Sequence, residues 1–152
     1  MSAHLGLHGL ILIFSLATVQ AGDVPSIVEK TKPAVVEILT FDKESKPLKT
    51  GTGFFVSSDG ALLTNFHVIS GASSIMAKTP TGAVYFLKGV IAESEADDVV
   101  KLQFLATDVS YLTLGSSLKA VEGQRVLVIG NPEGLEGQPL TASFPHSALV
   151  EA

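Results

Sequence analysis

The sequence predicts an all-β domain, built as a small antiparallel barrel or sandwich. Short runs of branched and apolar residues alternate with turn signals, and little room is left between them for helix. The 14 glycines and 7 prolines among 152 residues are consistent with many turns. A hydrophobic fraction of 46% against 16% charged residues excludes a disordered chain. The length indicates one domain.

The expected elements are one short helix, several loops and turns, and the strands that they separate. A short helix over residues 24–32 is ended by Pro33. A polar loop is expected over 42–49, tight turns over 57–60, 79–82 and 121–123, an acidic loop over 93–97 and a short extended piece over 111–114. Strands are expected over residues 34–40, 53–56, 61–65, 74–78, 83–91, 99–105 and 125–130. This makes six or seven strands, and the alternation is lost from residue 138 onward.

Composition excludes several classes of function. The absence of cysteine removes disulfides, thiolate metal sites and a cysteine nucleophile. A net charge of −5 without a basic tract gives no reason to expect a nucleic-acid partner. The glycine-rich segments match neither a dinucleotide loop nor a phosphate loop, and His146 has no second histidine nearby. We therefore expect no cofactor and no metal.

The first 21 residues are predicted to be a signal peptide. The apolar run begins at Leu10 and ends near Ala21, where small residues favour cleavage. The alternative is an uncleaved anchor helix, but the run is shorter than a membrane span requires. The prediction is therefore a secreted or periplasmic protein that has no membrane contact after cleavage.

A histidine and an aspartate stand out as candidates for chemistry. His67 lies just past an apolar strand, and Asp98 opens a later strand after an acidic loop. Histidine is suited to proton transfer near neutral pH, and a carboxylate on its other ring nitrogen fixes the tautomer. Asp97 is the competing aspartate. Taken without their context, such pairs are most often structural or incidental.

The context of His67 resembles the trypsin-like serine proteases of the HtrA/Deg type. Residues 51–69 carry the Gly-Phe hairpin, the Ser-Asp-Gly turn and the string Leu63-Thr64-Asn65-Phe66-His67-Val68 typical of that family. The strand Asp98-Val99-Val100-Lys101-Leu102 is similar to the one that opens with the family's triad aspartate. Further matches occur at residues 71–82, 114–117 and 121–132. The resemblance covers about residues 25 to 137.

The resemblance implies a fold, an activity and two site residues. The fold is the first of the two antiparallel barrels of the trypsin-like (chymotrypsin) fold, over residues 22–137, with the second barrel missing and a divergent tail over 138–152. The activity is serine-type endopeptidase action on polypeptide substrates, with His67 as general base and Asp98, preferred over Asp97, as its orienting partner.

The nucleophile of this family is absent from the sequence. Its Gly-Asn-Ser-Gly loop has no counterpart here, and the neighbours of Ser116, Ser117, Ser143 and Ser147 do not form one. We therefore expect this form to be inactive, as a frameshifted or truncated gene product or a real short one. The alternatives are a non-catalytic pseudoprotease or peptide-binding barrel, and an inert fragment. An exposed barrel face is expected to cause self-association.

Overall fold

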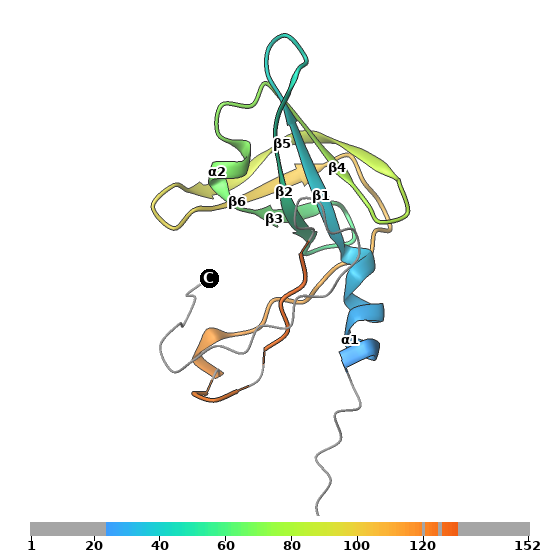
Figure 1. Cartoon of the computed structure of the whole chain (residues 1–152), viewed down its shortest axis with the longest axis vertical. Helices are drawn as coiled ribbons and strands as arrows, with labels where there is room; N and C mark the ends of the chain where they lie inside the picture. The colour runs from blue at the N-terminus through green and yellow to red at the C-terminus, as the bar shows by residue number, and fades with distance from the viewer. Residues whose placement is uncertain (1–23, 120, 125, 131–152) are drawn as a thin grey trace, which may run out of the picture.

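The computed structural model describes residues 24–119, 121–124 and 126–130. The predicted signal peptide over 1–21 and the predicted tail over 138–152 lie outside these residues. Six antiparallel strands form a closed barrel in the order β1-β2-β3-β6-β5-β4 (Figure 1). The prediction of an all-β antiparallel barrel is therefore confirmed.

The elements keep the order expected from the sequence. Helix α1 is Val24–Thr31, and the 3-10 turn Lys32–Ala34 leads from it into the barrel. The strands are β1 Val35–Phe41, β2 Pro47–Phe55, β3 Ala61–Thr64, β4 Ser74–Lys78, β5 Val84–Ser94 and β6 Val99–Phe104. A four-residue helix, α2 Phe66–Ile69, joins β3 to β4, and a second 3-10 turn is Ser117–Lys119.

Closure of the barrel overturns one predicted strand. Strand β1 pairs with β2 on one side and with β4 on the other, so the ring of six has no free edge. A strand needs a partner for its backbone groups, and a closed barrel offers none. Residues 126–130 accordingly form only an isolated bridge at Val128 rather than the predicted strand over 125–130.

Two loops are shorter than the sequence predicts. The carboxylate of Asp42 accepts hydrogen bonds from the backbone N–H groups of Glu44 and Lys46 at 2.9 and 2.8 Å. These bonds tighten the turn, so β2 begins at Pro47, inside the predicted polar loop over 42–49. Strand β5 likewise runs on to Ser94, into the predicted acidic loop.

The barrel interior is filled by large apolar side chains. Phe55, Phe104 and Leu62 are at most 1% exposed. The ring of Phe55 packs edge-on against Tyr85 and Phe104, with centroids 5.8 and 6.4 Å apart. These contacts join β2 to β5 and β6 across the core, which makes Phe55 a central packing residue.

The predicted turn over 57–60 depends on glycine. Gly60 has φ +92°, and a Cβ there would lie 2.7 Å from the backbone oxygen of Phe104. Glycine alone fits both conditions without strain, so the hairpin between β2 and β3 forms where the sequence predicts it.

Among the residues that the structure describes, no helix is long and apolar enough to cross a membrane.

Candidate active site

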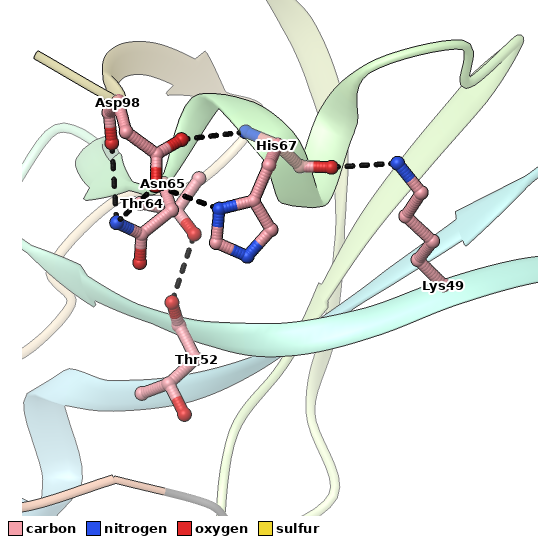
Figure 2. A network of polar contacts seen from close by, with 6 residues as sticks. All are labelled: Lys49, Thr52, Thr64, Asn65, His67 and Asp98. Atoms are coloured by element: carbon pink, nitrogen blue, oxygen red, sulfur yellow. Dashed lines mark hydrogen bonds and ion pairs between the residues drawn. The ribbon is translucent and has the colours of Figure 1, made fainter.

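Strand pairing brings His67 and Asp98 to the same end of the barrel. β3 and β6 pair antiparallel, with Thr64 opposite Val100. His67 follows the end of β3, and Asp98 precedes the start of β6, so both lie beyond the same end of this pair. The ring nitrogen Nδ1 of His67 lies 2.6 Å from Oδ2 of Asp98 (Figure 2). The two residues singled out from the sequence are thus brought together.

Asp98 holds the backbone around His67 as well as its ring. Its Oδ1 accepts the backbone N–H of His67 at 2.8 Å, and its main-chain oxygen accepts the N–H of Phe66 at 3.3 Å. The side-chain amide of Asn65 donates to the Asp98 main-chain oxygen at 3.1 Å and to Oδ2 at 3.2 Å. One residue therefore anchors the start of α2 and orients the histidine.

The backbone conformation of Asp98 is unusual. Its φ is +51°, in the left-handed region that aspartate and asparagine tolerate better than most residues. Its N–H donates to the Glu95 carbonyl at 3.2 Å, which closes the turn before β6. The turn aims the carboxylate at α2.

The competing aspartate has a different partner. Asp97 accepts a hydrogen bond from the hydroxyl of Ser94 at 2.6 Å, within the turn that precedes β6. The geometry distinguishes the two acidic neighbours, since Asp98 is the one that contacts His67.

Close packing beneath α2 fixes the height of His67 above the barrel. Val68 is buried, and a Cβ on Gly51 would lie 2.6 Å from its Cγ2 atom. Glycine at position 51 therefore lets the helix sit directly on β2. The buried Thr64 hydroxyl donates to the Thr52 carbonyl at 2.8 Å and joins β3 to β2 next to the pair (Figure 2).

The pair is open to solvent on the side away from the core. The side chains of His67 and Asp98 are 68% and 43% exposed. The second ring nitrogen of His67 points away from Asp98 (Figure 2). An imidazole whose Nδ1–H donates to a carboxylate presents the lone pair of Nε2, and such a group can take a proton from a hydroxyl placed against it.

Two polar neighbours of the pair were not recognised as such from the sequence. Asn65 entered only as part of a motif, and its two bonds to Asp98 depend on the turn geometry. Lys49 falls in the polar loop that the sequence predicts, yet its ammonium donates to the carbonyl of His67 in α2 and to the carbonyl of Ser70, which directly follows α2. No sequence signal points to a lysine contact that spans 18 residues.

The hydrogen bonds at Asp98 lower the pKa of its carboxyl group. The backbone N–H of His67 contributes most and the His67 ring comes next, because both stabilise the ionised form. The pKa is lower in the folded protein than in the unfolded chain, where a carboxyl group of this kind has a pKa of about 3.9. The ionised carboxylate therefore stabilises the fold at pH values above about 3.9. This contribution is lost as the pH falls through the lower folded value.

We expect the difference in free energy of unfolding between the wild type and Asp98→Ala to become smaller as the pH falls. The difference should be complete above about pH 5, where the unfolded carboxyl of pKa about 3.9 is ionised, and should shrink below that value. Urea unfolding of both proteins across this range measures it. The control is Asp97→Ala, because Asp97 contacts Ser94 rather than His67. A stability difference for Asp98→Ala that is constant with pH would contradict the assignment.

The chain that carries this site is similar in sequence to known proteins. The family model described as "Trypsin-like peptidase domain" matches residues 51–151. "Serine protease HTRA1" of Xenopus laevis is 33% identical over 124 residues, which cover 78% of this chain and 27% of that protein. "Probable periplasmic serine endoprotease DegP-like" of Hahella chejuensis is 29% identical over 166 residues, covering 84% of this chain and 35% of that protein.

Solved structures agree with the sequence relatives. The structure described as "HtrA-type protease AlgW with tripeptide" superimposes with a TM-score of 0.66 at 27% identity, covering 76% of this chain and 36% of that chain. The chain thus spans about a quarter to a third of the length of these relatives. By its sequence, its barrel and its relatives, this chain belongs to the trypsin-like peptidase family and within it to the HtrA type.

Proposed function

We propose that His67 is the general base, and Asp98 its orienting partner, for peptide-bond hydrolysis by acyl transfer to a serine. The observation that carries the proposal is the 2.6 Å contact between His67 Nδ1 and Asp98 Oδ2. The carboxylate holds the proton on Nδ1 and leaves Nε2 as the proton acceptor. The same imidazole then returns the proton to the leaving amine, while Asp98 stabilises the transient imidazolium.

The proposed substrates are polypeptides. A bound tripeptide is named for one related structure, and the relatives are named as serine proteases. We further propose that the chain acts outside the cytoplasm, as its predicted signal peptide suggests and as the name of the Hahella chejuensis relative says of that protein. Self-association through an exposed face of the barrel stays a prediction, and the exposed apolar side chains on strand β5 include Phe86, Val90 and Ile91.

We propose that the 152-residue chain does not hydrolyse peptide bonds on its own. No Gly-Asn-Ser-Gly string occurs in the 152 residues, and acyl transfer needs a serine presented next to an oxyanion hole. This observation also favours a second candidate function, a non-catalytic peptide-binding barrel. In that case His67 and Asp98 would be retained as a structural pair that anchors α2.

We expect the purified chain not to react with a fluorophosphonate probe, because labelling requires an activated hydroxyl.

A chimera tests the His67–Asp98 pair itself. In this chimera, residues 24–130 replace the matching segment of the Xenopus laevis relative, which supplies the remainder of a protease. Labelling should appear in the chimera and be lost in its His67→Ala variant. Equal labelling of the two chimeras would contradict the proposed role of His67, and His67-dependent labelling of the 152-residue chain would contradict its proposed inactivity.

A further inference from the structure

The main chain of His67 is held by charged side chains on both sides. Its N–H donates to the Asp98 carboxylate at 2.8 Å, and its carbonyl accepts a hydrogen bond from the Lys49 ammonium at 2.7 Å. Lys49 also donates to the carbonyl of Ser70 at 3.2 Å. Figure 2 shows Lys49 reaching from β2 to α2 on the side opposite to Asp98.

Helix α2 depends on such contacts for its position. It contains four residues, and the N–H of Ser70 donates to the carbonyl of Phe66 at 3.1 Å to close its single turn. A helix this short has no stability of its own in water, because nucleation costs more than one turn returns. Asp98 anchors its start, Val68 anchors its underside, and Lys49 reaches the carbonyl groups at its end.

The backbone of Lys49 is itself fixed. Thr40 is 1% exposed, and its hydroxyl accepts the Lys49 N–H and donates to the Lys49 carbonyl, both at 2.9 Å. This pair lies where the register between β1 and β2 shifts, between Thr40 and Phe41. The next carbonyl, that of Phe41, accepts the N–H of Ser73 in the loop after α2 at 2.8 Å. The end of β1 therefore supports both Lys49 and the loop that leaves α2.

We propose that Lys49 is a positioning residue, which sets the orientation of His67 toward Asp98 by holding the carbonyl groups at the end of α2. An ammonium group suits this task because it has three donors and can bond two carbonyls at once. Charged donors also form stronger hydrogen bonds than neutral ones, and a cation is favourable beside the carbonyl end of a helical turn. The relevance to catalysis rests on the proposed function, whereas the contacts do not.

The test compares Lys49→Met, Lys49→Arg and the wild type as the full 152-residue chain. The matched control is Lys78→Met, which removes the same charge from a lysine paired with Glu37. Amide hydrogen exchange at Ser70 reports closure of α2, and the carbon-13 titration of the Asp98 carboxyl reports its bonds to His67. Thermal unfolding shows that each variant is folded.

We expect Lys49→Met to accelerate exchange at Ser70 by about three- to tenfold, the range for the net loss of one ordinary hydrogen bond, because water screens the exposed ammonium group. It should also raise the Asp98 titration midpoint, because His67 donates less well. Lys49→Arg should restore both, and Lys78→Met should change neither. Faster exchange with an unchanged Asp98 titration would overturn the proposal, as would no change in either. A chimera indifferent to His67 would overturn the proposed function alone.

Discussion

Asp98→Asn in the chimera should lower kcat by about 10⁴, the loss typical of a triad aspartate replaced by its amide, and should lower kcat/KM with it. Asparagine keeps the shape of the side chain and tolerates the left-handed backbone found at this position, with φ +51°. It cannot hold the proton on His67 Nδ1 as a carboxylate does, so the ring presents the wrong tautomer to the nucleophile. Initial rates on a peptide substrate measure the effect.

The neighbouring aspartate supplies the control for this experiment. Asp97→Asn changes the same charge one residue earlier, but Asp97 contacts Ser94 in the turn rather than His67. Its kcat/KM should stay close to that of the parent chimera. Equal losses for the two substitutions would mean that the acidic turn acts through its charge, and they would contradict a specific role for Asp98.

Phe55→Ala should destabilise the chain by about 3–5 kcal/mol, the usual cost of removing a buried aromatic ring. Phe55 is fully buried, and its ring contacts Tyr85 and Phe104, so the substitution leaves a cavity between three strands. A domain of this size has about 5–15 kcal/mol of stability in total, so much of it would be lost. Urea unfolding gives the difference directly.

An exposed phenylalanine is the matched control for this cavity. Phe86 lies on β5 and is 59% exposed, so Phe86→Ala removes the same atoms with little loss of packing. Its stability should change by less than about 1 kcal/mol, as for most surface substitutions. A loss at Phe86 as large as at Phe55 would contradict the assignment of the core to the barrel interior.

Local signals in the sequence were sufficient to predict most of the strands and turns of the barrel. The turn over 57–60 was predicted from its residues and depends on the positive φ of Gly60. Residues 125–130 form an apolar run like the true strands, but strand formation depends on an available edge. The closed ring of β1 to β6 offers no such edge, and this is a property of the whole chain rather than of the segment.

The candidate site, like the barrel, was predictable from the sequence only in part. The motif around His67 and the position of Asp98 before an apolar strand identified the pair, and the structure places them 2.6 Å apart. The polar neighbours of Lys49 predict a loop. Its contact with the carbonyl of His67 depends on the register of β2 and on the position of α2, and neither leaves a trace in local composition.

The most direct test of the account is the ring tautomer of His67 in the 152-residue chain, measured by long-range nitrogen-15 NMR. The spectrum is recorded near pH 9, well above the ordinary histidine pKa of about 6.5. A carboxylate of Asp98 bonded to the ring should give a protonated Nδ1 and an unprotonated Nε2, and this tautomer should be retained in Asp97→Ala and lost in Asp98→Ala. A wild-type ring protonated on Nε2, or a tautomer that is unchanged in Asp98→Ala, would contradict the assembled His67–Asp98 pair.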